Sequence, residues 1–156
     1  MPSPPPGPFI IEEYVRWSDV DFAGIIFYGS YVRFFEIAET ELFRAAGLPH
    51  REFFDRFDIW LPRKAVHAEF FRPARLDDRL RVATYVARLG TKSLTLNFDV
   101  VHDDGPKLSA AGWQVLVCVD RPRLKSRPLP GELVRALAPY TLAADAARVA
   151  LGVTLP

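Results

Sequence analysis

Residues 17–47 constrain the fold of this chain more than any other stretch, because they predict one long buried helix. Ser30 can cap the start of this helix, and Gly47, with Pro49 soon after, can end it. An acidic loop over residues 18–27 precedes the helix and suggests a site at its N-terminus. Apolar side chains recur at helical spacing along one face: Tyr31, Phe34, Phe35, Ala38, Leu42 and Ala45.

Runs of alternating or continuously apolar residues predict five strands around that helix. Three of them follow one another through glycine-containing turns at residues 88–92 and 103–106, which is typical of an antiparallel meander. The sequence therefore predicts an α+β fold in which a five-stranded antiparallel sheet wraps around one long central helix. The predicted strands are residues 9–17, 65–71, 79–86, 93–100 and 108–120. We expect a short helix or a structured loop within 48–60 and short helical segments within 131–138 and 141–156.

The 156 residues suffice for one domain over residues 9–140, between a proline-rich flexible arm (1–8) and a C-terminal tail (141–156). A net charge of +1 implies no general attraction to nucleic acid or to membranes. Cys118 is the only cysteine, which excludes an intrachain disulfide and a cysteine-based zinc site. No apolar run approaches the roughly 20 residues of a membrane helix, and the start lacks signal-peptide features. We therefore expect a cytoplasmic protein.

Five strands around one helix leave one sheet face and at least one edge strand uncovered. Pairing two copies edge to edge would cover that edge. We therefore expect a homodimer or a homotetramer.

The segment from Asp19 to Tyr31, read with this layout, resembles the signature of the hotdog-fold acyl-CoA thioesterases, and most closely that of the 4-hydroxybenzoyl-CoA thioesterase family. The signature runs Asp-x-Asp-x-x-Gly, two hydrophobic residues, an aromatic residue, Tyr or His, two residues and Tyr. The resemblance covers roughly residues 9–138 and implies an acyl-CoA thioester hydrolase without a metal or redox cofactor. Further similarity lies at residues 61–62, 76–78, 92–93 and 127–130.

By this resemblance, Asp21 is the catalytic carboxylate, acting as nucleophile on the thioester carbonyl or as base on a water. The backbone N–H of Tyr28, beside Gly29, matches the family's oxyanion stabiliser at the start of the central helix. Gly24 permits the turn that brings Asp21 back over this helix end. The chain departs from the family at Phe22, where proline is common, and at Tyr28, where several relatives carry histidine.

The resemblance also implies where acyl-CoA binds, with the active site at a dimer interface. The phosphates of coenzyme A would meet cations in the turn before the predicted strand at residues 93–100 and in the segment after the last strand. Glu36 matches a family position that is often acidic and could contact the acyl group or orient water, and Leu61 lies in a matching segment. The matching phosphate-end residues are Arg88, Lys92, Ser93, Arg123 and Lys125.

Several alternatives stay open at this point. Asp21 could be only a turn residue, Glu36 could pair with Arg33 or Arg44, and residues 121–127 could be a solvated loop. An aromatic content of 13% favours a flat aromatic acyl group such as hydroxybenzoyl or aminobenzoyl. The rival functions are a hotdog-fold hydratase or dehydratase, a non-catalytic acyl-CoA-binding module and a nucleic-acid binder. The hydratase is disfavoured because no histidine stands in residues 17–47, and the nucleic-acid binder because the chain is nearly neutral.

Overall fold

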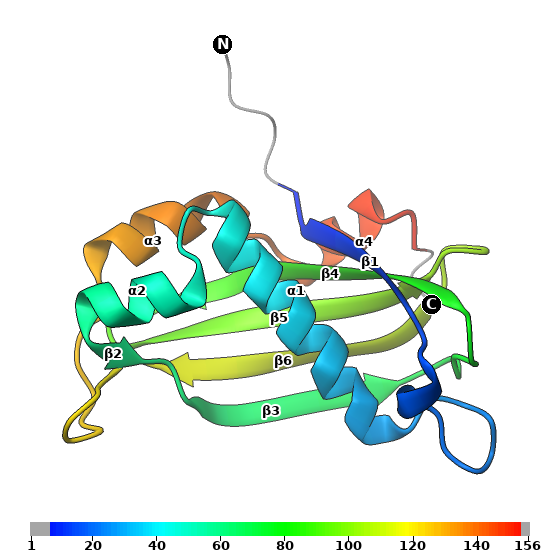
Figure 1. Ribbon diagram of the computed structural model, residues 1–156. Helices are drawn as coiled ribbons and strands as arrows, with labels where there is room; N and C mark the ends of the chain where they lie inside the picture. Colours follow the sequence, from blue (N-terminus) through cyan, green and yellow to red (C-terminus); the bar gives the residue numbers. More distant parts are fainter. Residues whose placement is uncertain (1–6, 154–156) are drawn as a thin grey trace.

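The computed structural model describes residues 7–153. Five antiparallel strands form one curved sheet, and one long helix crosses its concave face (Figure 1). These elements are β1 (Phe9–Tyr14), α1 (Tyr31–Ala45), β3 (Arg63–Phe70), β4 (Arg79–Leu89), β5 (Ser93–His102) and β6 (Leu108–Val117). The strand order is β1-β4-β5-β6-β3, so the predicted fold class is confirmed and the sheet edges are β1 and β3.

Shorter elements cover the ends of the sheet. They include a two-stranded sheet of β2 and β7 beside α2, and a C-terminal group of helices. Their bounds are η1 (Trp17–Asp19), η2 (Tyr28–Ser30), α2 (His50–Phe57), β2 (Ile59–Trp60), β7 (Val119–Asp120), α3 (Gly131–Leu137), η3 (Ala138–Tyr140) and α4 (Ala144–Ala150). Within residues 7–153, no helix is both long and apolar enough to cross a membrane.

The apolar face of α1 packs on the sheet as the helical periodicity predicts. Phe34 and Phe35 are fully buried, and Phe35 stacks on Phe98 of β5 with ring centroids 4.5 Å apart. Gly112 of β6 makes room for this pair, because a Cβ there would lie 3.0 Å from the Phe35 ring and even closer to the carbonyl oxygen of His67. A side chain at Gly112 would therefore push α1 or β3 away from the sheet.

The two ends of α1 differ in how well the sequence predicts them. Gly47 adopts the left-handed conformation (φ +81°) and ends the helix as expected. Ser30 occupies the N-cap position, but its side chain does not cap the helix: its backbone angles are helical, and its hydroxyl donates to the carbonyl oxygen of Asp19 at 3.2 Å. The physical reason is that η2 precedes α1, so the chain is already coiled at Ser30.

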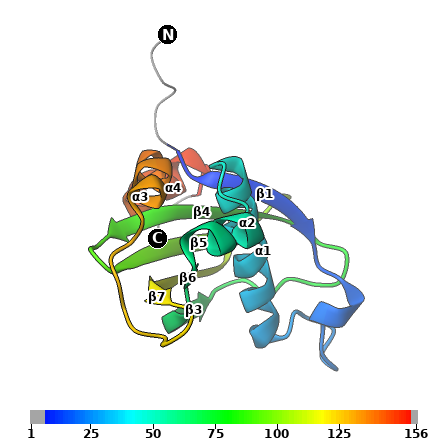
Figure 2. The same cartoon turned by 60° about the vertical axis from the view of Figure 1, so that its left-hand side comes forward.

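The C-terminal residues lie against the outer face of the sheet, opposite α1 (Figure 2). Leu151 and Val153 pack on Ala83 of β4 and Val101 of β5. The helical turn predicted in this segment is α4. The predicted flexible arm falls mostly on residues 1–6, outside the described residues, and the predicted domain boundaries remain predictions.

Candidate active site

The loop between η1 and η2 holds Asp21 in a tight turn. Gly24 has φ +75°, and its N–H donates to the carbonyl oxygen of Asp21 at 3.0 Å. The N–H of Asp21 donates to the carbonyl oxygen of Ile25 at 3.1 Å. The Asp21 carboxylate is exposed and accepts one hydrogen bond, from the N–H of Ala23 at 2.8 Å. Gly24 therefore plays the turn role predicted for it, and one Asp21 carboxylate oxygen remains without a protein donor among the described residues.

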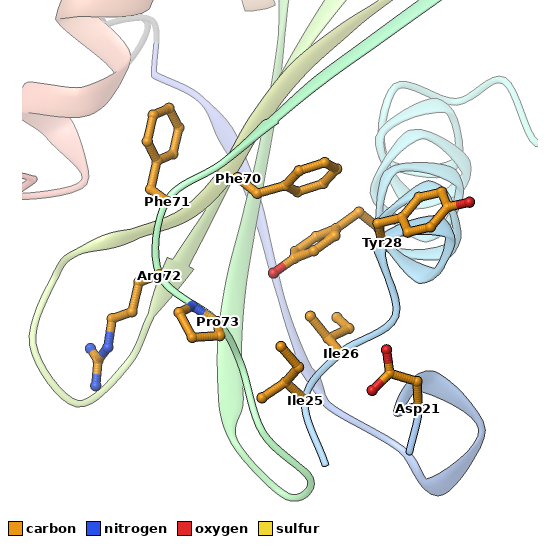
Figure 3. Close-up of a pocket in the computed structure, with 9 residues that line it drawn as sticks. Asp21, Ile25, Ile26, Tyr28, Phe70, Phe71, Arg72 and Pro73 are labelled. Atoms are coloured by element: carbon orange, nitrogen blue, oxygen red, sulfur yellow. The ribbon is translucent and has the colours of Figure 1, made fainter. Parts of the chain in front are cut away.

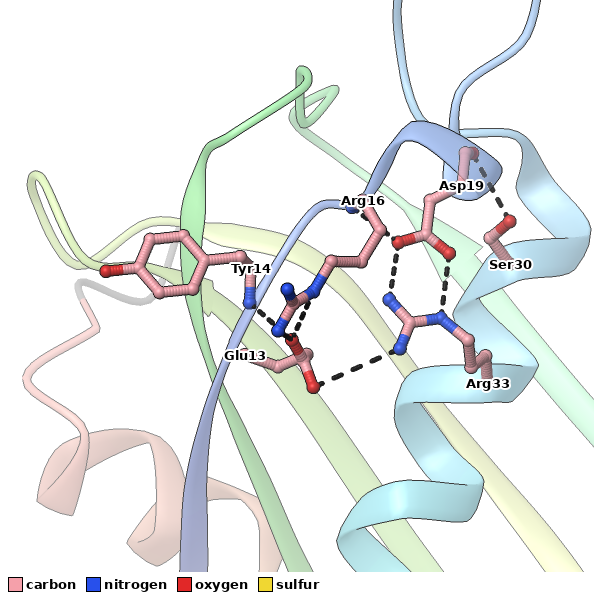
Figure 4. Close-up of polar contacts among 6 residues, drawn as sticks. All are labelled: Glu13, Tyr14, Arg16, Asp19, Ser30 and Arg33. Atoms are coloured by element: carbon pink, nitrogen blue, oxygen red, sulfur yellow. Dashed lines mark hydrogen bonds and ion pairs between the residues drawn. The ribbon is translucent and has the colours of Figure 1, made fainter.

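Asp19, two residues earlier, anchors this loop to α1 (Figure 4). Its carboxylate is 1% exposed and accepts hydrogen bonds from the Arg33 side chain, including Nε at 2.8 Å, and from the N–H of Arg16 at 2.7 Å. Its carbonyl oxygen accepts hydrogen bonds from the N–H of Phe27 at 2.6 Å and from Ser30. The two ends of the loop are thus tied to each other and to the start of α1.

The charge of Asp19 is balanced within this cluster. Burial opposes ionisation of the Asp19 carboxyl, but hydrogen bonds from the Arg33 guanidinium and the Arg16 N–H hold its pKa below the ordinary value. Arg33 also lies 4.0 Å from Glu13 of β1. Asp19 is therefore a structural carboxylate, whereas Asp21 is exposed and has no ion-pair partner among the described residues.

An open pocket of about 420 Å³ lies between the Asp21 loop, the start of α1 and the chain that follows β3 (Figure 3). Its walls are largely apolar and aromatic, and the Asp21 carboxylate stands at its rim. Tyr31 forms one wall, with its ring 5.2 Å from that of Phe70 and its hydroxyl 2.8 Å from Ser109 Oγ. The lining residues are Asp21, Ile25, Ile26, Tyr28, Tyr31, Phe70, Phe71, Arg72 and Pro73.

Tyr28 and Gly29 open the short helix η2 that leads into α1. Within the described chain, neither backbone N–H is hydrogen-bonded, as expected for the first turn of a helix. A helix N-terminus also carries positive partial charge. The two residues predicted to be catalytic, Asp21 and Tyr28, thus line the same pocket, and Gly24 and Gly29 lie beside them in the chain.

The predicted coenzyme A residues lie elsewhere in the protomer. The turn after β4 and the segment after β7 are neighbours, because the N–H of Leu129 donates to the carbonyl oxygen of Thr91 at 2.9 Å. Leu61 is buried at this end, in an apolar pocket of about 410 Å³ that also includes Phe54, Trp60, Pro62, Arg63, Val119 and Leu124. Within residues 7–153, no ion pair involves the cations Arg88, Lys92, Arg123 or Lys125.

Strand register shows that these two groups occupy opposite ends of the sheet. Phe70, beside Asp21, pairs with Ala110 of β6, whereas Arg63 pairs with Leu116, which in turn pairs with Leu94 next to Ser93. The eight residues of β3 separate the two ends by roughly 23 Å. One protomer therefore does not unite the predicted catalytic and coenzyme A residues.

Glu36 lies between these ends, on the side of α1 that faces β3. It accepts a hydrogen bond from Thr40 at 3.3 Å and lines a pocket of about 250 Å³. The expectation that Glu36 might pair with Arg33 or Arg44 is wrong, because Arg33 binds Asp19 and Arg44 binds Glu41.

The same pocket holds a buried charged pair that the sequence did not reveal. Glu39 is 1% exposed and pairs with Arg63, whose Nε donates to Gln114 Oε1 at 3.1 Å. Burial lowers the pKa of the nearby His50 side chain, whose Nε2 lies 3.8 Å from Glu39. Among the described residues, no cluster of three or more His, Cys, Asp or Glu side chains could hold a metal ion.

Sequence reasoning also missed the pocket wall contributed by Phe70, Phe71, Arg72 and Pro73. The only available signal was the position of this Phe-Phe-Arg-Pro segment at the end of a predicted strand. Arg33 was missed as the partner of Asp19 because fourteen residues separate them.

A family model described as the thioesterase-like superfamily matches residues 15–137. The chain therefore belongs to this superfamily, and the prediction of an acyl-CoA thioester hydrolase is confirmed at this level. It is 32% identical over 120 residues to the acyl-CoA thioester hydrolase YbgC of Escherichia coli, covering 77% of this chain and 88% of that protein.

Two further relatives carry names that specify an acyl group. A 1,4-dihydroxy-2-naphthoyl-CoA hydrolase of Thermosynechococcus vestitus is 27% identical over 119 residues, covering 76% of this chain and 81% of that protein. The crystal structure of a 1,4-dihydroxy-2-naphthoyl-CoA thioesterase from Synechocystis has a TM-score of 0.79 at 23% identity, covering 85% of this chain and 96% of that one. The latter similarity confirms the fold.

Proposed function

We propose that this protein hydrolyses aromatic acyl-CoA thioesters that carry a hydroxyl or amino group, using Asp21 as the catalytic carboxylate. The observation that carries the proposal is the Asp21 carboxylate at the rim of an aromatic pocket, beside the free N–H groups of Tyr28 and Gly29. This arrangement supplies a nucleophile or base and an oxyanion site to the same thioester carbonyl.

The reaction needs negative charge on the carbonyl oxygen to be stabilised while the carbon is attacked. The Tyr28 N–H at the helix start donates to that oxygen, and the partial positive charge of the helix end adds to the effect. Asp21 either attacks the carbonyl carbon, giving an anhydride that water then hydrolyses, or removes a proton from the attacking water. In both routes the C–S bond breaks, coenzyme A leaves as its thiolate and takes up a proton, and the free acid is released.

We infer that a homodimer completes the site, because one protomer separates Asp21 from the coenzyme A cations. Strand β3 is an edge strand whose side chains are mostly exposed, and its free edge can pair with a second β3. In an antiparallel pair, the Phe70 end of one β3 lies beside the Arg63 end of the other. The pairing therefore places Asp21 of one subunit next to the basic end of its partner.

Coenzyme A would then cross the interface with its phosphates on the basic end. Arg88, Lys92, Arg123 and Lys125 are exposed and have no acidic partner within residues 7–153, so they are available to phosphate. Ser93 follows Lys92 and can donate a hydrogen bond to the same groups.

The acyl group would lie along α1, between the Tyr31 pocket and Glu36. Five residues of helix separate Tyr31 from Glu36, a rise of about 7.5 Å. A benzoyl or naphthoyl ring fits this length, and the Glu36 carboxylate can accept a hydrogen bond from a hydroxyl or amino substituent. A relative acting on a dihydroxynaphthoyl-CoA supports the same substrate class.

Release of free thiol from a panel of acyl-CoAs tests this proposal. The panel contains benzoyl, hydroxybenzoyl, aminobenzoyl, dihydroxynaphthoyl, hexanoyl and palmitoyl thioesters. We expect the highest kcat/KM with a hydroxylated or aminated aromatic thioester. Preference for hexanoyl or palmitoyl would overturn the acyl assignment, and tight binding without thiol release would favour a non-catalytic acyl-CoA-binding module.

A further inference from the structure

Phe22, the residue after Asp21, stands fully exposed at the tip of the Asp21 loop. A lone exposed apolar side chain is ordinary, but this one projects from a loop that Gly24 and the Asp19–Arg33 pair hold in place. Trp17, at the base of the same loop, is also largely exposed. The loop therefore holds an aromatic side chain in place, and this side chain packs against nothing within residues 7–153.

The apolar pocket around Leu61 has the complementary shape, since it is a hollow that no side chain within residues 7–153 fills. Its volume of about 410 Å³ exceeds that of a phenyl ring several-fold, and Trp60 and Leu124 form its exposed walls. Leu124 is 65% exposed and has φ +55°, an unfavourable conformation for a leucine. Arg121 lies over the Trp60 ring at 4.2 Å and fixes that wall.

The exposed Phe22 loop and the apolar pocket around Leu61 are placed so that a two-fold axis would bring the loop of one subunit to the pocket of the other. In Figure 1, the blue loop near residue 22 and the yellow loop near residue 124 both extend on the β3 side of the sheet, at its opposite ends. Antiparallel pairing of two β3 strands turns one copy by half a turn about an axis perpendicular to the sheet. The Phe22 loop of one subunit then meets the Leu124 loop of the other, twice per dimer.

Charge complementarity favours the same contact. Asp21 neighbours Phe22, whereas Arg123 and Lys125 flank Leu124 and have no ion-pair partner in the described part of the chain. A carboxylate on one loop and two cations on the other attract each other when the loops approach.

We propose that Phe22 of each subunit inserts into the pocket of its partner formed by Trp60, Leu61 and Leu124. This contact locks the Asp21 loop against the basic end where coenzyme A binds. The inference rests on the β3-paired dimer of the proposed function, and it assigns Phe22 as a positioning residue. Because the contact is isologous, both active sites of the dimer gain it together.

Cross-linking tests the contact without using enzyme activity. Phe22→Cys and Leu124→Cys are prepared as separate proteins, mixed, allowed to exchange subunits under mild denaturant, and treated with an oxidant or with a short bis-maleimide. We expect a covalent dimer from the mixture and much less from either protein alone, since the proposed contact joins position 22 to position 124. Replacing Leu124→Cys with Val149→Cys, an exposed position on α4, provides the matched control.

Absence of the mixed cross-link with both reagents, while light scattering shows a dimer, would overturn the Phe22 contact and leave the thioesterase proposal intact. A monomer with full thiol release would overturn the dimer itself. In contrast, a specific cross-link in a protein that releases no thiol would preserve the contact and reject the proposed activity.

Phe22→Ala provides a second, energetic measurement. Two buried phenylalanines per dimer predict a dimer dissociation constant raised on the order of 10²- to 10⁴-fold, measured by analytical ultracentrifugation. We expect the kcat of Phe22→Ala to fall at concentrations that keep it dimeric, with Phe22→Leu restoring most of the loss. An unchanged dissociation constant and unchanged kcat would contradict the proposal.

Discussion

The two ends of the sheet in this protein are built for different tasks. At the Phe70 end, the Asp19–Arg33 pair and a turn at Gly24 hold a loop rigidly, so that a single exposed carboxylate stands beside the helix N-terminus. The Arg63 end carries four exposed cations that have no ion-pair partner within residues 7–153: Arg88, Lys92, Arg123 and Lys125. Arg63 and Arg121, at the same end, are paired with acidic side chains. This difference is the basis of our proposal that one end positions the reacting carboxylate, that the other holds the phosphates of coenzyme A, and that two protomers share each site.

The largest effect on catalysis should come from replacing Asp21, the exposed carboxylate at the Phe70 end of the sheet. Asp21→Asn keeps the side-chain shape and the hydrogen bond from Ala23 but removes the nucleophile or base. We expect kcat to fall on the order of 10³-fold, with the thermal midpoint unchanged. Asp145→Asn, an exposed aspartate on α4, is the control. Near-normal thiol release by folded Asp21→Asn protein would contradict the assignment of Asp21 as the catalytic carboxylate.

The rigidity of that end should depend on Asp19. Asp19→Asn leaves the Arg33 guanidinium without its carboxylate, and we expect a loss of about 2–3 kcal/mol in the free energy of unfolding. Urea denaturation measures this loss, and Asp145→Asn again serves as the control.

The same substitution should alter the acid sensitivity of the protein. Because the folded-state pKa of Asp19 is lowered, its stabilisation is complete above the unfolded pKa of about 4 and disappears as the pH falls through the lower folded value. The difference in unfolding free energy between wild type and Asp19→Asn should therefore shrink at pH values below about 4. A difference that stays constant to low pH would show that the Asp19 charge is not responsible.

Substitutions at the basic end should have a smaller effect on activity, because several cations share the proposed binding of the coenzyme A phosphates. The double substitution Arg123→Ala and Lys125→Ala should raise KM for acyl-CoA by roughly tenfold, with little change in kcat, and weaken the dependence of KM on salt. Replacing Arg51, an exposed arginine on α2, by Ala is the control. A fall in kcat at unchanged KM would mean that this end does not bind the phosphates.

The smallest effect concerns Glu36, midway between the ends. Glu36→Gln keeps an acceptor oxygen but removes its charge, so we expect a several-fold loss of kcat/KM for hydroxybenzoyl-CoA relative to benzoyl-CoA. Equal losses for both thioesters would assign Glu36 to a general structural role.

The elements of the fold could be predicted from the sequence because their signals are local. The period of the apolar residues defined α1, and Gly47 and the meander turns marked where elements end. The role of Ser30 was misjudged because the short helix before α1 has no such periodic signal. The placement of Asp21 and Tyr28 at one pocket could also be predicted, since the two residues are close in sequence, whereas their catalytic role remains a prediction.

The distances between distant residues could not be predicted in this way. Strand register alone shows that Lys92 and Asp21 lie at opposite ends of the sheet, and register depends on pairing between β3, β6 and β5. The Asp19–Arg33 and Glu39–Arg63 pairs likewise require the folded arrangement. The sequence predicted the loop that carries Asp21 and a paired subunit. The separation of Asp21 from the predicted coenzyme A residues within one protomer, in contrast, emerged only from the three-dimensional structure.

Subunit complementation tests most directly whether each site is shared between two protomers. Asp21→Asn protein is mixed with the Arg123→Ala, Lys125→Ala double variant, subunits are exchanged under mild denaturant, and thiol release is measured at low acyl-CoA. Half of the dimers at random exchange are mixed, and each mixed dimer has one intact site, so activity should approach about one quarter of wild type. Activity no higher than the average of the two parent variants would contradict a shared site and place the whole reaction within one protomer.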